Sequence, residues 1–297
     1  MKRLFLLLLC VGLCTGSVAS REVVFVAYNV DNFAPLVIPD GVQRPVKSKE
    51  SADAVLQIIG EMKPDILGVC EMGAAPQFEE FRRRLEEAGL RYIDAEFVKA
   101  ADADRHLALV SRFPIVARNS VGDAPYEING TRGKVRRGFL DVTVELAPGC
   151  RLRIIGVHLK SKLSSPDSGD TDLERRQEAR LLRKHIDAIH TADPALPLLV
   201  FGDFNDTKEQ STIQEISGPS GSPQRITPLR LADSHGDRWT HYWKVNDVYA
   251  RIDFLFTNRA LAPWVVPDRS GVHRSPLWNK ASDHRPIFVT LAPPALQ

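Results

Sequence analysis

Cysteine is scarce in this chain, and the few cysteines do not form a recognisable metal site. Cys10 and Cys14 lie in an N-terminal apolar run, so only Cys70 and Cys150 belong to the rest of the chain. No cluster of cysteine and histidine has the spacing of a zinc site, which counts against a structural zinc. Export would permit a disulfide between Cys70 and Cys150, but the sequence does not decide whether they pair.

Other absences exclude further classes of protein. No G-x-x-x-x-G-K-[ST] run is present, which counts against nucleoside triphosphate hydrolysis. After residue 20, no apolar stretch reaches the roughly 20 residues that a membrane-spanning helix needs, so we expect no transmembrane segment. The chain has no internal repeat and no linker-like tract, and about 250 residues is a usual size for one large domain. We expect one domain over residues 21–297.

Charge of one sign is not in excess. The chain has 39 Lys and Arg against 37 Asp and Glu. Loss of an N-terminal segment that contains Lys2 and Arg3 leaves 37 basic residues (39 minus 2), so the rest of the chain is formally neutral. This argues against a strongly basic, DNA-coating protein, because phosphate contacts supply most non-specific affinity for nucleic acid.

The first twenty residues have the pattern of an export signal. Lys2 and Arg3 precede an apolar run over residues 4–14, and small residues follow at 17–20. A basic start, a short apolar run and a small-residue cleavage site are typical of a signal peptide, and the run is too short for a membrane anchor. We therefore expect a cleaved signal peptide at residues 1–20.

A lipid anchor on Cys10 or Cys14 is the alternative to simple cleavage. Residues 11–14, Val-Gly-Leu-Cys, match a lipoprotein processing site poorly. We therefore expect a secreted or periplasmic protein, monomeric and without a stable protein partner.

Short apolar, β-rich runs alternate with amphipathic helical runs along the chain. Apolar side chains three and four residues apart predict three helices: one after a cap at Ser51, one that ends at Gly89, and one over residues 173–189. Strands are predicted over residues 21–30, 65–70, 92–98, 107–110, 139–146, 152–159, 198–201, 252–256 and 287–291. Because helices separate some strands while short turns join others, mixed sheets fit better than an all-parallel sheet.

Five polar residues lie at or just beyond the C-terminal ends of predicted strands. They are Asn29, Glu71, His158, Asp203 and Asn205. In layered α/β folds, sites are built at such strand ends and in the loops that follow them. Each residue alone has an ordinary structural explanation, such as a turn-stabilising side-chain bond or a buried core histidine. Their shared position favours a common site.

A further segment, residues 282–286, reads Ser-Asp-His-Arg-Pro. The Asp283 side chain can bind a hard cation, while the next side chain, His284, can transfer a proton. Carboxylate and amide oxygens are the ligands that suit Mg²⁺, Mn²⁺ or Ca²⁺. Such a cation, a base and donors to phosphate oxygens are what water needs to attack a phosphorus ester. The residues therefore indicate phosphoester hydrolysis.

The ordered set of motifs resembles the endonuclease/exonuclease/phosphatase superfamily, which includes DNase I-like nucleases, exonuclease III-like enzymes, sphingomyelinases and inositol phosphatases. The motifs follow the family's order over nearly the whole chain after residue 20. They are Tyr28-Asn29, Cys70-Glu71, His158-Leu159-Lys160-Ser161, Gly202-Asp203-Phe204-Asn205, Arg251-Ile252-Asp253 and Ser282-Asp283-His284-Arg285-Pro286. The resemblance implies an α/β fold, a four-layer α/β/β/α sandwich of two mixed β-sheets flanked by helices.

The resemblance also implies roles for the site residues. Glu71 is expected to be the main metal ligand, with Asn29 and Asp283 near the cation, directly or through water. Mg²⁺ is the expected ion, with Mn²⁺ and Ca²⁺ as alternatives. His284 is expected to act as a general base or to contact the phosphate, and Asp253 to accept its ring proton and fix its orientation.

The remaining catalytic positions concern water and the leaving group. Asp203 and Asn205 are expected to orient the attacking water and hold the phosphate. His158 is expected to contact the phosphate or to help the leaving oxygen depart. The sequence leaves open whether Asp203 or His284 takes the proton.

Three further residues have roles that rest on weaker patterns. Asp104 falls where DNase I-like members have a carboxylate that orients the histidine at the position of His158, although a solvated turn acid explains it equally well. Arg136 or Arg137 could bind a phosphate through a bidentate contact. The alternative for these arginines is a solvated, basic loop.

His158 narrows the choice among branches of the family. Exonuclease III-like enzymes usually place a tyrosine there, whereas DNase I-like, sphingomyelinase-like and phosphatase branches have histidine. We therefore expect a secreted, metal-dependent phosphoesterase, first of all a nuclease-like phosphodiesterase whose partner is a phosphate ester such as nucleic acid. A phospholipid or small phosphate-ester hydrolase is the alternative, although no convincing membrane-docking hairpin is recognisable. The aromatic residues at 239–243 could stack on a base or sugar, but packing under a loop is the simpler expectation. A non-catalytic phosphate-binding protein is the remote alternative.

Overall fold

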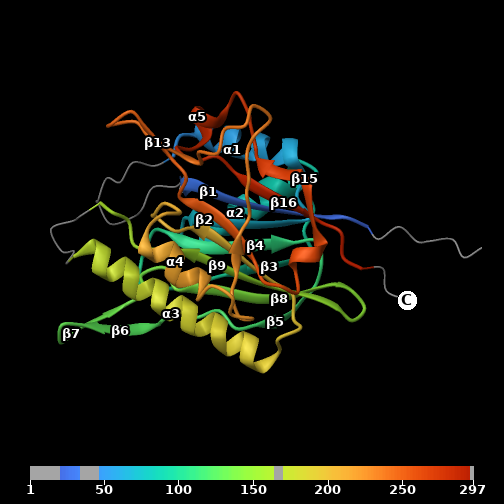
Figure 1. Cartoon of the computed structure of the whole chain (residues 1–297). Helices are drawn as coiled ribbons and strands as arrows, with labels where there is room; N and C mark the ends of the chain where they lie inside the picture. The colour runs from blue at the N-terminus through green and yellow to red at the C-terminus, as the bar shows by residue number, and fades with distance from the viewer. Residues whose placement is uncertain (1–20, 34–46, 164–169, 295–297) are drawn as a thin grey trace, which may run out of the picture.

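The computed structural model describes residues 21–33, 47–163 and 170–294. They form two six-stranded mixed sheets that pack face to face, with helices over the outer faces (Figure 1). The predicted four-layer sandwich is therefore confirmed. The signal peptide predicted at residues 1–20 lies outside the described residues. Within the described ranges, no helix is long and apolar enough to cross a membrane.

The first sheet is built around the parallel pair β1 (Val23–Phe33) and β2 (Ile66–Met72). Strand β16 (Ile287–Leu291) pairs antiparallel with β1. The sheet order is β15-β16-β1-β2-β4-β3, with β15 (Val265–Val272), β4 (His106–Ser111) and β3 (Asp94–Phe97) completing it. The apolar sides of α1 (Lys49–Met62) and α2 (Ala75–Glu87) pack on its outer face.

The second sheet repeats this plan. Strands β9 (Cys150–His158) and β10 (Leu198–Asp203) are parallel, and β14 (Asp253–Thr257) pairs antiparallel with β10. The order is β11-β14-β10-β9-β8-β5, with β11 (Thr227–Pro228), β8 (Phe139–Ala147) and β5 (Ile115–Arg118) completing it. Helices α3 (Thr171–Ala192) and α4 (Ser211–Ser217) pack on its outer face.

Smaller elements extend from the sandwich. Two hairpins are formed by β6 (Pro125–Ile128) with β7 (Thr131–Lys134), and by β12 (His241–Trp243) with β13 (Val248–Ala250). A short 3-10 helix (Ala262–Trp264) precedes β15, and α5 (Trp278–Ala281) precedes β16.

Phe201 on β10 occupies the centre of the layer between the two sheets. Its ring is fully buried and lies 5.2 Å from the ring of Phe25 on β1, centroid to centroid. Gly68 on β2 of the facing sheet and Gly156 on the neighbouring strand β9 make room for it, because a Cβ atom would approach the ring to 2.3 Å at Gly68 and to 2.6 Å at Gly156. Such distances are well inside van der Waals contact, so these positions exclude a larger residue while Phe201 is present.

Helix α1 does not begin where the sequence predicted. Helix α1 begins after Ser48, whose hydroxyl accepts a hydrogen bond from the Ser51 backbone N–H, so the cap predicted at Ser51 is wrong by one turn. The Ser51 hydroxyl instead donates to the Lys280 carbonyl, 2.7 Å away, and ties α1 to α5. Cys70 and Cys150, whose pairing the sequence left open, are both buried and free.

Candidate active site

The predicted site residues meet at one end of the sandwich because the strands that carry them end there. In the first sheet Asn29 is paired with Cys70, so the residue after it, Glu71, reaches the same edge. In the second sheet Asp203 is paired with both His158 and Asp253. The ends of both parallel pairs, and the start of β14, therefore place their polar side chains side by side.

The backbone at Glu71 and Asn205 has the left-handed conformation. Their φ angles are +61° and +50°, and the pairing of β2 with β4 is irregular between Val69 and Met72. A non-glycine residue in this region can cost about 1–3 kcal/mol, and such residues often cluster at functional sites. The irregular strand end re-aims the Glu71 side chain out of the usual alternation and toward the second sheet.

Asn29 links the two sheets through one amide group. Its Nδ2 atom donates to Glu71 Oε1 at 3.2 Å and to Asp203 Oδ2 at 3.1 Å, and lies 3.4 Å from His284 Nε2. Its Oδ1 atom accepts from the Asp31 backbone N–H at 3.1 Å, which fixes the orientation of the amide. One neutral side chain therefore holds the two carboxylates and the histidine around a common point.

Hydrogen bonds fix both the ring and the backbone of His284. Its Nδ1 atom lies 2.8 Å from Asp253 Oδ2, and its backbone N–H donates to Ser282 Oγ, which in turn donates to the Asn29 carbonyl at 2.9 Å. Burial alone would lower the pKa of His284. The negative charge of Asp253 and the hydrogen bond that Asp253 accepts, together with the charge of Asp203, outweigh burial and raise the pKa of His284 well above its usual value. The imidazole therefore favours its charged form.

The pKa of Asp203 is also raised, which for a carboxyl group favours the neutral form. Burial is the main cause that raises the pKa of Asp203 to about 7, and the negative charges of Asp253 and Glu71 add to it. His284, with Nε2 3.7 Å from Asp203 Oδ2, and the Asn205 backbone N–H, 2.8 Å from Oδ1, act against that rise. The carboxyl can therefore gain or lose a proton near neutral pH.

Glu71 and His158 complete the buried cluster. Burial raises the pKa of Glu71, and the guanidinium of Arg105, with Nε 3.6 Å from Oε2, opposes it. His158 Nε2 lies 3.8 Å from Glu71 Oε1 and 3.6 Å from Asp203 Oδ2. Burial, then the charge of Arg137, lowers the pKa of His158 well below its usual value, so this ring is neutral.

Of the residues with weaker predictions, Arg137 is the one whose charge acts on His158. Arg137 is buried, with Nε 3.0 Å from Asp102 Oδ2, whereas Arg136 is exposed. The Asp104 backbone N–H donates to Asp102 Oδ1. Among the described residues, His158 Nδ1 has no hydrogen-bond partner, so the structure does not show the bond through which Asp104 would orient that ring.

Sequence reasoning missed His241 and Arg105 as neighbours of the site. His241 Nε2 lies 3.5 Å from Asp283 Oδ2, and its ring lies 4.6 Å from that of His284. The backbone N–H of Tyr242 donates to the Asp283 carbonyl at 2.9 Å, so β12 fixes the loop that carries Asp283. The only sequence signal was a polar residue inside the aromatic run at 239–243.

The site has the donors that a hard cation requires. Three groups of side chains have ligand atoms within 4.8 Å of one another: Glu71 with His158 and Asp203, Asp203 with Asp253 and His284, and His241 with Asp283 and His284. Oxygen atoms predominate where the carboxylates meet, which suits Mg²⁺, Mn²⁺ or Ca²⁺. Burial of Glu71 and Asp203 disfavours their charged forms, and a bound cation would offset that penalty.

A buried carboxyl on α3 supports the loop that follows His158. Glu178 is 1% exposed, and its Oε2 accepts a hydrogen bond of 2.7 Å from the Lys160 backbone N–H. Burial raises the pKa of Glu178 from 4.5 to about 7. No sequence pattern predicted this contact, because the two residues lie on different elements.

Glu178 is expected to make the protein less stable as pH rises. The folded protein holds its proton more tightly than the unfolded chain, so the contribution is full below about pH 4.5 and is lost as pH rises through about 7. Wild type should lose up to about 3 kcal/mol of unfolding free energy relative to Glu178→Gln between about pH 5 and pH 8. Urea denaturation at each pH measures this difference. Exposed Glu86→Gln is the control, and equal pH profiles for wild type and Glu178→Gln would contradict the prediction.

Comparison with known proteins is consistent with this site. A model of the endonuclease/exonuclease/phosphatase family matches residues 26–284. Among curated proteins, no sequence matches the chain significantly.

Solved structures of low sequence identity share the fold. An endonuclease/exonuclease/phosphatase from Bacteroides vulgatus superposes with a TM-score of 0.63 at 19% identity, covering 92% of this chain and 100% of that one. The human Nocturnin catalytic domain with bound sulfate superposes with a TM-score of 0.62 at 18% identity, covering 91% of this chain and 93% of that one. Sphingomyelinase C from Streptomyces griseocarneus superposes with a TM-score of 0.60 at 16% identity, covering 92% of this chain and 100% of that one.

Proposed function

The chain belongs to the endonuclease/exonuclease/phosphatase family, and from that premise we propose that it is a metal-dependent phosphodiesterase of the nuclease type. Water would attack phosphorus directly and in line, without a covalent enzyme intermediate. The observation that carries the proposal is the pairing of Asp203 Oδ2 with His284 Nε2, 3.7 Å apart, where raised pKa values favour a neutral carboxyl group and a charged imidazole. One group is suited to accept a proton and the other to donate a hydrogen bond to a phosphate oxygen.

We propose that Glu71 is the main ligand of a Mg²⁺ ion, with Asn29 and Asp283 near it. When bound, such an ion neutralises charge on the phosphate and makes a water molecule more acidic. Mn²⁺ and Ca²⁺ use the same oxygen donors and are the alternatives. His241 would hold the Asp283 carboxylate in place, because it is the neighbouring side chain that contacts it at 3.5 Å.

The protein's own groups then divide the proton transfers. We propose that Asp203 takes the proton from the attacking water, because a pKa of about 7 suits a base that works near neutral pH. His284, held charged by Asp253, would donate to a non-bridging oxygen. Neutral His158 would lie beside the leaving oxygen, and Asn205 would hold the phosphate. The Asn205 Nδ2 atom already donates to the Leu159 carbonyl at 3.0 Å, which orients its amide.

Other assignments extend the proposal. Arg137 or Arg136 would bind a phosphate oxygen, and Asp104 would orient His158. The segment 1–20 would be a signal peptide removed on export, leaving residues 21–297 as a secreted or periplasmic domain. N-terminal sequencing of the exported protein tests the last point, and a first residue before position 21 or a retained leader would contradict it.

Removal of divalent metal is expected to abolish hydrolysis. With bis(p-nitrophenyl) phosphate as substrate, excess EDTA should stop turnover and added Mg²⁺ should restore it, because burial of Glu71 leaves a site that is unfavourable without a cation. Glu71→Gln should raise the Mg²⁺ concentration for half-maximal activity at least about tenfold. Exposed Glu79→Gln on α2 is the matched control and should not change it.

Two results would contradict that expectation. Full activity in EDTA would exclude the metal-dependent mechanism. Metal binding in a calorimeter, without turnover of any phosphate ester, would favour the non-catalytic phosphate-binding alternative.

A second candidate function is hydrolysis of phospholipids. The hairpin of β12 and β13 exposes apolar side chains, with Val245 85%, Tyr249 52%, Val248 46% and Trp243 40% exposed. A hairpin that the sequence did not reveal therefore offers apolar side chains for an interface. Hydrolysis of phosphatidylcholine or sphingomyelin vesicles that falls with Val245→Asp, while bis(p-nitrophenyl) phosphate hydrolysis is kept, would favour this function.

A further inference from the structure

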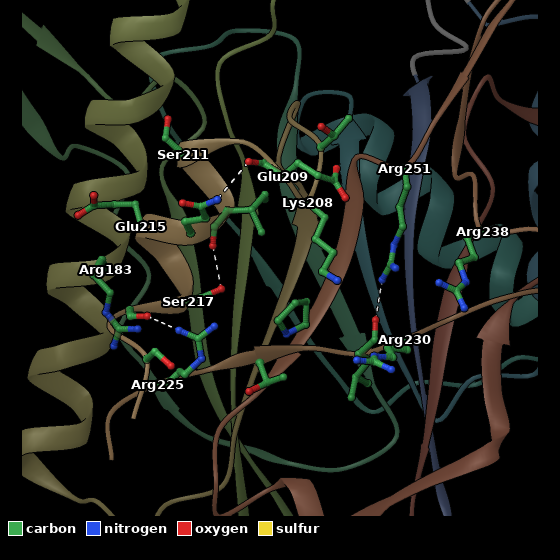
Figure 2. A pocket seen from close by; sticks show the side chains of 18 of the residues that line it. Arg183, Lys208, Glu209, Ser211, Glu215, Ser217, Arg225, Arg230, Arg238 and Arg251 are labelled. Atoms are coloured by element: carbon green, nitrogen blue, oxygen red, sulfur yellow. Dashed lines mark hydrogen bonds between the residues drawn. The ribbon is translucent and has the colours of Figure 1, made fainter. Parts of the chain in front are cut away.

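A large groove lies at the edge of the second sheet, outside the cluster described above. It has a volume of about 1470 Å³ and is lined by α4, the loop after β10, strand β11 and the chain that leads into β14. Figure 2 shows Arg183 and Arg225 on the side of the groove nearest α3, and Lys208, Arg230, Arg238 and Arg251 on the opposite side. No proposed catalytic role uses these residues.

The side of the groove away from α3 carries uncompensated positive charge. Among the described residues, Lys208, Arg230 and Arg238 form no ion pair, and all three are exposed. Glu209 is the acidic residue of this part of the groove. Near α3, by contrast, Arg183 is already paired with Asp187 at 2.7 Å. Positive charge without a protein partner is therefore concentrated on one side.

Arg251 is the fixed member of the cationic side. Its Nη2 atom donates to the Leu229 carbonyl at 2.6 Å, and its guanidinium lies 4.8 Å from the centre of the Phe254 ring. Burial lowers the pKa of Arg251, and the positive charge of Arg238 lowers it further. Two like charges are thus held near each other, and an anion between them would relieve their repulsion.

Two residues that line the groove, Arg251 and Lys208, are close in sequence to catalytic residues. Arg251 precedes Asp253 by two residues, so their Cα atoms are at most about 7 Å apart. Lys208 follows Asn205 by three residues, which limits that separation to about 11 Å. The groove is therefore within reach of the next units of a chain molecule whose reacting phosphate lies at Asp203.

An exposed aromatic face accompanies the cations. Tyr249 lines the same groove, is 52% exposed and stacks on Tyr242 with ring centroids 4.5 Å apart and planes at 23°. Trp239 supports it from the edge at 4.8 Å. Cations that follow a phosphate backbone, together with aromatic rings on which bases stack, are the means by which proteins bind single-stranded nucleic acid.

We propose that this groove binds a single-stranded nucleic acid segment, with Lys208, Arg230, Arg238 and Arg251 on its phosphates and Tyr249 against a base. The proposal rests on the nuclease-type function, which it extends from one phosphodiester to the strand beyond it. A phospholipid carries one phosphate group and would leave most of these cations unpaired.

Binding of fluorescent 12-mer strands of DNA and RNA, measured by anisotropy in EDTA over a range of salt, tests the groove. Arg230→Ala/Arg238→Ala should weaken binding about tenfold and reduce the slope of log K against log salt by about 1 to 1.5, because two phosphate contacts are lost. Arg259→Ala, an exposed arginine beyond the other end of β14, should change neither. The DNA and RNA arms show which strand is preferred.

Turnover separates this inference from the function on which it rests. The ratio of kcat/KM for the oligonucleotide to that for bis(p-nitrophenyl) phosphate should fall about tenfold in the double variant. If no phosphate ester is hydrolysed but binding still depends on Arg230 and Arg238, the proposed catalysis fails and the groove stands. The proposed groove would be overturned by an unchanged salt slope, or by an effect of Arg259→Ala equal to that of the double variant. It would also be overturned if the double variant lost binding to phosphatidylglycerol vesicles but kept binding to the oligonucleotides.

Discussion

His284→Ala is expected to lower kcat for phosphodiester hydrolysis by about 10³-fold while the protein stays folded. The substitution removes the group that Asp253 holds charged at 2.8 Å and that lies 3.7 Å from Asp203. Loss of a positioned proton-transfer group costs about 10²–10⁴-fold, and loss of a donor to the developing charge costs a similar factor. Steady-state kinetics with bis(p-nitrophenyl) phosphate at saturating Mg²⁺ measures the change.

Matched variants separate chemistry from folding in that experiment. His284→Gln retains a neutral donor and should recover part of the activity, whereas Asp253→Asn keeps the ring but not its charged partner and should cost about 10–100-fold. Circular dichroism and thermal unfolding of each variant show whether the fold is kept. A folded His284→Ala protein with activity within tenfold of wild type would remove His284 from the mechanism.

Phe201→Ala is expected to lower the free energy of unfolding by about 4 kcal/mol. The side chain is fully buried between the sheets, and deletion of such a ring costs about 3–5 kcal/mol through lost burial and the cavity left behind. Phe201 lies two residues before Asp203 on β10, so the same cavity loosens the strand that carries the proposed base. Urea denaturation followed by circular dichroism measures the loss. Half-buried Phe288→Ala is the control and should cost less.

A double-mutant cycle identifies the cause of that loss. Gly68→Ala alone should destabilise the protein, because its Cβ would lie 2.3 Å from the Phe201 ring. In the Phe201→Ala background the same methyl group enters the vacated space and should be neutral or stabilising. Additive effects, or a loss of less than about 1 kcal/mol for Phe201→Ala, would contradict the packing described between the sheets.

The strands and helices that form the sandwich could be predicted because the apolar residues of each element recur with one clear period in the sequence. The helix predicted at residues 173–189 is α3 with its ends extended, since a continuous apolar stripe faces the second sheet. Strand β15 was missed because it contains Pro267, Asp268 and Arg269, and its pairing with β16 is irregular between Val266 and Gly271. A bulged edge strand has no apolar alternation for a sequence reading to detect.

The site could be predicted where it depends on strand ends and not where it depends on distant loops. Asn29, Glu71 and Asp203 converge because parallel strands end at one edge, which sequence position already indicates. His241 and Glu178 reach the site from a hairpin and a helix, and their partners are fixed only by tertiary packing. Their polar character was visible in the sequence, but their neighbours were not.

The formal neutrality of the chain after residue 20 also hid a local feature. A sum over all residues gives no excess of positive charge, yet four cations share one side of a groove with a single acid. Overall charge governs long-range attraction to nucleic acid, whereas a groove beside the catalytic residues can bind a strand through local contacts. Formal neutrality therefore counts against a DNA-coating protein but not against a nuclease.

Nicking of supercoiled plasmid by the purified protein in Mg²⁺, with Asp203→Asn alongside, tests whether Asp203 is the base of a metal-dependent nuclease site. We expect that wild type nicks the plasmid, that EDTA stops the nicking, and that Asp203→Asn is slower by at least about 10²-fold because the buried base is lost. Equal nicking by folded Asp203→Asn, or nicking that continues in EDTA, would contradict a metal-dependent site built around Asp203.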